Sequence, residues 1–160
     1  MKKINHENEY KNTSNGFTLI EILVVIGIIA VLATVVLVAI NPSRQFKLAR
    51  DSQRVSNVNA ILNTISQNIA EHHGVFMCGD IAMALPAIST VVKSGLGGFD
   101  LAPCVVPAYI SVLPYDPSIV GAHYGNIADY DTKYEVYEDI DGRVTAMSKG
   151  EITNTISVTR

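Results

Sequence analysis

One carboxylate stands alone in the most apolar part of this 160-residue chain. Glu21 follows Phe17 by four residues, and the run from Phe17 to Ile40 contains no Lys, Arg or His. A carboxylate in hydrocarbon costs about 2.5–3.5 kcal/mol on insertion scales unless a cation pairs with it. Two solutions are therefore open: a cation from outside this run, or a position near the interface from which the carboxylate reaches water.

Gly16 indicates one source of such a cation. Cleavage of the peptide bond between Gly16 and Phe17 would create a new α-amino group at the start of the apolar run. Its positive charge would lie about one helical turn from Glu21 of the same chain, or close to Glu21 of a neighbouring copy. On this interpretation the chemistry is formation of an ion pair, and the chain would be the substrate of a protease; a Glu21 that reaches water from the interface is the alternative.

The apolar run is long enough to cross a bilayer. As a helix, its 24 residues would extend about 36 Å, compared with about 30 Å of hydrocarbon. A cleaved secretory signal has a shorter apolar core of about 7–15 residues and a small-residue cleavage site after it. Apolar side chains occupy every face, which is not typical of a helix buried on one side. We therefore predict a transmembrane helix over residues 17–40.

The stretch GFTLIEILVVIGIIAVLA resembles the N-terminal signature of type IV prepilins and type II secretion pseudopilins. The resemblance implies that prepilin peptidase removes residues 1–16 on the cytoplasmic side and N-methylates Phe17. It also implies that Glu21 pairs with the Phe17 amine of a neighbour as subunits stack into a filament. The resemblance extends from residue 14 to about residue 73 and covers the remainder only loosely.

Two features depart from the family pattern. Asn15 stands where many members have Lys or Arg, and Pro42 comes about six positions later than the proline of many members. The charges flanking the span also conflict with the resemblance. Positive charge normally marks the cytoplasmic side, and by that rule the basic residues after the span would lie inside. The resemblance instead predicts that the leader is inside and the remainder is exported.

Beyond the span, the pattern predicts an amphipathic helix within residues 41–73. Its apolar stripe has alternating spacings of three and four and consists of Val55, Val58, Leu62, Ile65 and Ile69. Pro42 either opens a new helix capped by Asn41 or kinks one continuous helix. The resemblance favours the continuous, bent helix. We expect the stripe to pack under residues 74–160, and a coiled-coil seam with a partner is the alternative.

Residues 74–160 form the predicted globular head. The segments KYEVYEDI and RVTAMSK flank a hairpin signal at Asp141-Gly142, and TNTISVTR alternates as a third strand. Tyr134, Val136 and Ile140 are expected on one face. The predicted fold class is α+β and pilin-like: a long N-terminal helix, with a transmembrane half and an amphipathic half, packed against a small C-terminal antiparallel sheet.

Two sets of head residues each have two interpretations. Cys78 and Cys104 are the only cysteines, and they form either a disulfide, as an exported domain favours, or two buried thiols. Four aspartates are turn residues or, alternatively, oxygen ligands of Ca²⁺, although the ordered twelve-residue calcium-loop pattern is missing. They are Asp129, Asp131, Asp139 and Asp141. We expect no catalytic residues, no metal site and no cofactor.

A basic ridge follows the apolar run and is formed by Arg44, Lys47, Arg50 and Arg54. It either faces lipid head groups or contacts the heads of adjacent subunits, because residues 74–160 carry ten acidic and five basic residues. A nucleic-acid partner is not expected, since the ridge adjoins the membrane segment.

Together these observations predict a structural subunit of a type IV pilus or pilus-like filament. The domains are a leader at 1–16, a transmembrane and polymerisation helix at 17–40, an amphipathic spine at 41–73 and an exported head at 74–160. Expected partners are prepilin peptidase, copies of itself or related pilins, the inner-membrane assembly platform and, before assembly, the lipid bilayer. The chain would be a single-pass inner-membrane protein and then part of a surface or periplasmic filament. The alternatives are a type II secretion pseudopilin and a non-polymerising, membrane-anchored binding domain.

Overall fold

The computed structural model describes residues 16–160, and the chain divides into two compact units between Pro42 and Ser43. Of the predicted leader, residues 1–15 therefore lie outside the described part. The expectation about Asn15 lies outside it as well.

The first unit contains helix α1 (Leu19–Ile40), which has a mean hydropathy of 3.3 and no buried residue. Among residues 16–160 it is the one helix long and apolar enough to cross a membrane. The helix ends before Asn41, which has a left-handed φ of 49°. Proline disfavours helical geometry in the residue before it, and asparagine tolerates the left-handed region. A new helix thus opens at Pro42, and the expectation of one continuous helix is wrong at this point.

Helix α2 (Pro42–Glu71) buries one face in the second unit. Val58, Ile61, Leu62 and Ile65 are fully buried. The predicted stripe is right at its centre, but Val55 is 44% exposed and Ile61, which the stripe omitted, is buried. Because this face packs in the core of its own head, it is not the coiled-coil seam considered from the sequence.

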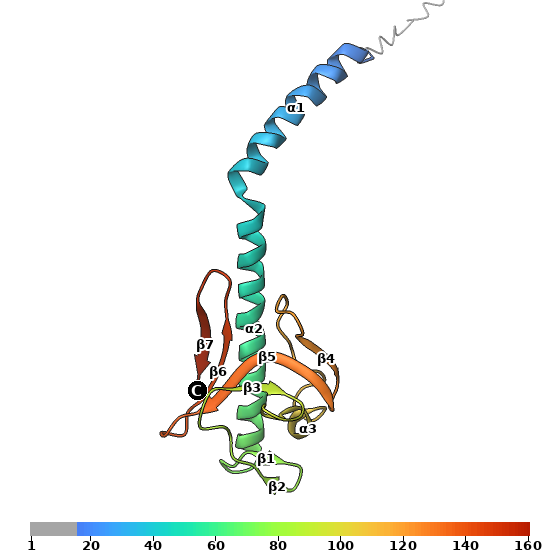
Figure 1. Ribbon diagram of the computed structural model, residues 1–160. Helices are drawn as coiled ribbons and strands as arrows, with labels where there is room; N and C mark the ends of the chain where they lie inside the picture. Colours follow the sequence, from blue (N-terminus) through green and yellow to red (C-terminus); the bar gives the residue numbers. More distant parts are fainter. Residues whose placement is uncertain (1–15) are drawn as a thin grey trace, which may run out of the picture. The chain divides into compact units, whose positions relative to one another are not determined.

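The head is built on an antiparallel sheet with strand order β3-β5-β6-β7 (Figure 1). Its strands are β3 (Thr90–Lys93), β5 (Asp129–Glu138), β6 (Val144–Lys149) and β7 (Thr155–Thr159), and β4 (His123–Asn126) also pairs with β5. The remaining elements are a small hairpin of β1 (Met77–Cys78) and β2 (Ile81–Ala82), and the short helix α3 (Ala102–Val105). The α+β, pilin-like fold class is confirmed, while β3 and β4 were not predicted.

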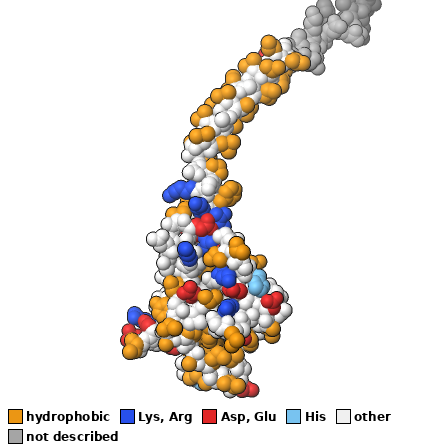
Figure 2. Space-filling model, viewed as in Figure 1, with side chains coloured by type: hydrophobic (Ala, Val, Ile, Leu, Met, Phe, Trp, Pro, Cys, Tyr) orange, Lys and Arg blue, Asp and Glu red, His pale blue; other side chains and the backbone are white. Residues whose placement is uncertain are grey.

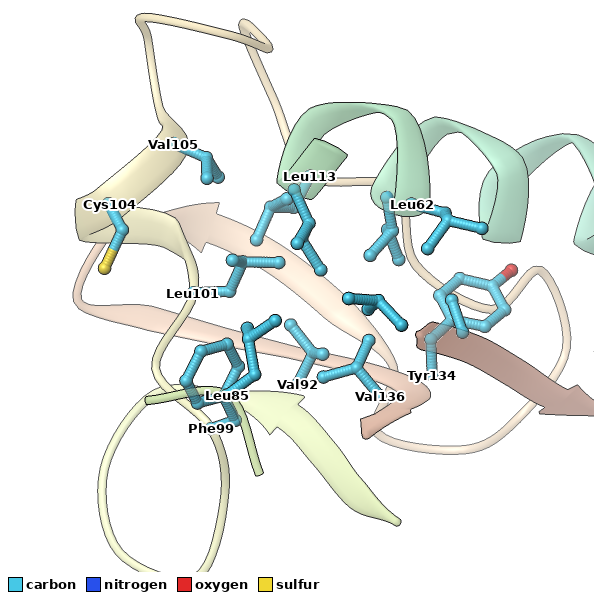
Figure 3. Close-up of a cluster of buried hydrophobic side chains, with 14 of the residues drawn as sticks. Leu62, Leu85, Val92, Phe99, Leu101, Cys104, Val105, Leu113, Tyr134 and Val136 are labelled. Atoms are coloured by element: carbon cyan, nitrogen blue, oxygen red, sulfur yellow. The ribbon is translucent and has the colours of Figure 1, made fainter. Parts of the chain in front are cut away.

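The core lies between α2 and the sheet, as Figure 3 shows. Alternate side chains of β5 point into it, including Tyr134 and Val136, because successive residues of a strand face opposite sides. Ile140 was expected on the same face, but it lies beyond the end of β5 and is fully exposed. Cys78 and Cys104 form a disulfide that ties the β1–β2 hairpin to α3.

Candidate functional site

The segment before α1 is open to solvent. Gly16, Phe17 and Thr18 are not helical, and the side chain of Phe17 is 84% exposed. Thr18 has an extended backbone, with φ −79° and ψ 151°, and is the N-cap of α1. The peptide bond between Gly16 and Phe17 therefore lies outside the helix, where another protein has access to it.

Thr18 and Glu21 form a reciprocal capping box. The backbone N–H and the hydroxyl of Thr18 each donate to Oε2 of Glu21 at 2.8 Å, and the N–H of Glu21 donates to Oγ1 of Thr18 at 3.3 Å. The carboxylate is thereby held over the first turn of α1, where unpaired N–H groups and the helix dipole favour negative charge. The Thr-x-x-Glu pattern was visible in the sequence, but Thr18 was not predicted as part of the site.

This geometry answers part of the question that Glu21 raises. Within residues 16–160, both hydrogen bonds that the carboxylate accepts end on Oε2, and no described group donates to the other oxygen, Oε1. The local cap offsets some of the cost of placing the charge in an apolar run. It does not neutralise the charge, because both donors come from Thr18, which is itself uncharged.

A second charged cluster lies in the head around Arg54, whose side chain is 1% exposed. Its guanidinium donates to both oxygens of Asp116, at 2.7 and 3.0 Å, and also to Asp51, Glu151 and Ser118. These hydrogen bonds, chiefly those to Asp116, raise the pKa of Arg54 against the opposing effect of burial. Burial alone would raise the pKa of Asp116, but Arg54 and two backbone N–H groups outweigh it and lower that pKa.

The same cluster fastens the loop between β6 and β7 to α2. Asp51 accepts hydrogen bonds from the backbone N–H groups of Glu151 and Ile152, at 2.8 and 2.9 Å. Arg50 makes a bidentate contact with Glu151, with both N···O distances 2.6 Å. The hydrogen bonds from Arg50, assisted by Ser118 and Arg54, lower the pKa of Glu151 to about 2. Two members of the predicted basic ridge, Arg50 and Arg54, thus pair with acids of their own chain.

The four aspartates considered as calcium ligands lie beside basic side chains. Asp129 contacts His123, Asp131 contacts Lys133, and both Asp139 and Asp141 contact Arg143. Asp131 and Asp139 also accept backbone N–H bonds of the kind that stabilises turns. Within the described residues, no three His, Cys, Asp or Glu side chains are grouped so that they could hold a metal.

Comparison with protein families finds a match to the prokaryotic N-terminal methylation motif over residues 11–37. The matched range includes the exposed Gly16–Phe17 bond, the capping box and most of α1, and it confirms the resemblance stated from the sequence. The comparisons with curated proteins and with solved structures give no match. The head is therefore interpreted from its own geometry.

Proposed function

Because the chain carries the prokaryotic N-terminal methylation motif, the signature of type IV prepilins and pseudopilins, we propose that it is a structural subunit of a type IV pilus or pilus-like filament. The observation that carries this proposal is the motif placed on an exposed, non-helical bond directly before an apolar helix. In this proposal residues 1–16 are the leader, 17–40 the membrane and polymerisation helix, 41–73 the spine and 74–160 the exported head.

The first step is proteolysis by prepilin peptidase. Water adds to the carbonyl carbon of Gly16 and the bond to the nitrogen of Phe17 breaks, which leaves a carboxylate on Gly16 and an α-amine on Phe17. The neutral form of this amine then takes a methyl group from a sulfonium methyl donor, which leaves as the thioether, and the methylated amine carries a positive charge once it is protonated. The extended backbone at Thr18 supports this step, because a protease needs its substrate outside helical hydrogen bonding. Gly16 has no neighbouring atom within 4 Å of a Cβ built on it, so the chain's own fold would accept a side chain there.

The second step is assembly through α1. Its apolar surface is exposed along its whole length, so in this proposal lipid surrounds it before assembly and neighbouring helices surround it afterwards. The Oε1 atom of Glu21 receives the Phe17 amine of an adjacent subunit, which supplies the positive charge that Thr18 lacks. The inner-membrane assembly platform and further copies of the chain or related pilins are the proposed partners.

The proposed role is structural and not catalytic, as the motif is that of structural pilins. The motif is shared by pilins and pseudopilins, so a type II secretion pseudopilus remains within the same proposal. In both cases the chain begins as a single-pass protein of the inner membrane with its head exported.

Intact-mass measurement of the chain recovered from its native envelope tests the proposal. We expect a mass that corresponds to residues 17–160 with one added methyl group. Gly16→Ala should block removal of the leader, because the peptidase and not the fold requires glycine. Gly27→Ala is the matched control, since a Cβ at Gly27 also meets no atom within 4 Å. A mature chain that retains Met1 would overturn the proposal.

A further inference from the structure

The first turns of α2 present an exposed basic and aromatic surface. Arg44, Phe46 and Lys47, which we call the α2 collar, are all exposed, and the side chain of Phe46 is 64% exposed. Figure 2 shows Lys and Arg side chains gathered where α2 meets the head, with Asp and Glu side chains beside some of them. The collar is therefore the part of the second unit where positive charge and an aromatic ring meet solvent together.

Lys47 differs from Arg50 and Arg54 of the predicted basic ridge. Arg50 and Arg54 are matched by Glu151 and Asp116 of their own head. Lys47, by contrast, forms no ion pair with any carboxylate within residues 16–160. Carboxylates of the head thus pair with Arg50 and Arg54 in the later turns of α2. Within residues 16–160 none of them pairs with Lys47, whose positive charge is available to a group outside the chain.

The small number of residues between the end of α1 and the collar determines what lies close to the collar. Arg44 comes four residues after the end of α1, and Lys47 lies five residues into α2, or about 8 Å along that helix at 1.5 Å per residue. The head-group layer of a bilayer is about 5–8 Å thick on each side of the hydrocarbon. If α1 spans the membrane, covalent connection alone keeps the collar in or beside this layer, whatever direction α2 takes.

We infer that the α2 collar binds the anionic head groups of the leaflet in which α1 ends, before the subunit enters a filament. Arg44 and Lys47 supply positive charge and N–H donors to lipid phosphates, and Phe46 supplies an apolar ring of the kind that interfacial helices bury at the boundary between head groups and acyl chains. The inference rests on the proposed membrane anchoring of α1. It adds a lipid-binding surface that the cleavage and assembly steps do not require.

The test uses the full chain in vesicles of phosphatidylcholine, alone or mixed with phosphatidylglycerol. Flotation with the vesicles first reports anchoring by α1. A water-soluble amine-acylating reagent then labels lysines, and mass spectrometry compares Lys47 with Lys93 of β3. We expect labelling of Lys47 to fall several-fold when phosphatidylglycerol is present, with Lys93 unchanged. The protection should disappear at about 1 M salt, where the screening length is about 3 Å.

Two variants and one titration make the result specific. Arg44→Gln should restore much of the labelling of Lys47, whereas Arg143→Gln, which removes the same charge from the β5–β6 turn, should leave the protection intact. Equal labelling of Lys47 in both lipids would overturn the inference while leaving the anchor in place. The inference would also be overturned if protection of Lys47 increased with the number of chains per vesicle and did not depend on lipid charge. The partner of Lys47 would then be an acidic head of a second copy. Failure to float would remove the anchor and this inference together.

Discussion

The apolar helix α1 and the head satisfy their charged groups in opposite ways. In α1 a single carboxylate, Glu21, is exposed, and among residues 16–160 only the uncharged groups of Thr18 donate to it. In the head, Arg54 is almost fully buried and three carboxylates of the same chain surround it. A charged group that is paired within the chain contributes to the stability of the fold. A charged group without a counter-charge is available to a partner.

Helix α1 and the head also differ in whether the family model matches them. The methylation motif ends at residue 37, within α1, and does not extend to the head. In the proposed function, α1 must fit both a processing enzyme and neighbouring copies, so few sequences can serve. A head needs only a packed core and satisfied polar groups, and many sequences achieve that.

The largest expected effect is on assembly and comes from Glu21. Glu21→Ala should leave membrane insertion intact and reduce filament yield strongly, because the Phe17 amine of the neighbour loses its counter-charge. Glu21→Gln should fail to nearly the same degree, although its amide oxygen still accepts a hydrogen bond from Thr18. Filament yield from cells expressing each variant measures this. If Glu21→Gln assembled normally, the cap and not the charge would be the functional feature.

The next effect is on stability and comes from Arg54. Arg54→Met should destabilise the head by about 3–5 kcal/mol, because it leaves Asp116 and Asp51 buried without their cation. Denaturant unfolding of the full chain in detergent, followed by near-UV circular dichroism of its tyrosines, measures the change. Arg143→Met is the control: its side chain is 60% exposed, and a surface ion pair contributes at most about 1 kcal/mol. Equal losses of unfolding free energy in Arg54→Met and Arg143→Met would contradict the expected difference between a buried and an exposed ion pair.

The smallest effect is the response of the same cluster to acid. The folded head holds the pKa of Glu151 at about 2 and lowers that of Asp116, so both lie below their values in the unfolded chain. The stability that these groups contribute is therefore complete above the unfolded pKa of Glu, about 4.5, and is lost as the pH falls from there toward 2. Unfolding free energies at pH 6, 4 and 3 should decrease in that order. Glu151→Gln should make the decrease shallower, and an unchanged slope would exclude Glu151 as a contributor.

Much of the fold could be predicted because it rests on local pattern. Strict alternation of inward residues identifies β5, and the Asp141-Gly142 turn places β6 after it. β3 and β4 were missed because they have four residues each and depend on pairing with β5, which lies far along the chain from β3. Val55 was assigned to the buried stripe because its spacing fits, yet no part of the head covers it completely.

By itself the sequence determined the apolar helix, the single carboxylate at its start and the methylation motif that contains the Gly16–Phe17 bond. These features follow from residue type and spacing over fewer than 30 residues. Only the tertiary structure decided which members of the basic ridge are neutralised. Asp51 is only three residues from Arg54, but the other carboxylate partners of Arg50 and Arg54 lie 62 to 101 residues away along the chain. No local pattern reports which distant carboxylates the folded sheet brings to these two arginines.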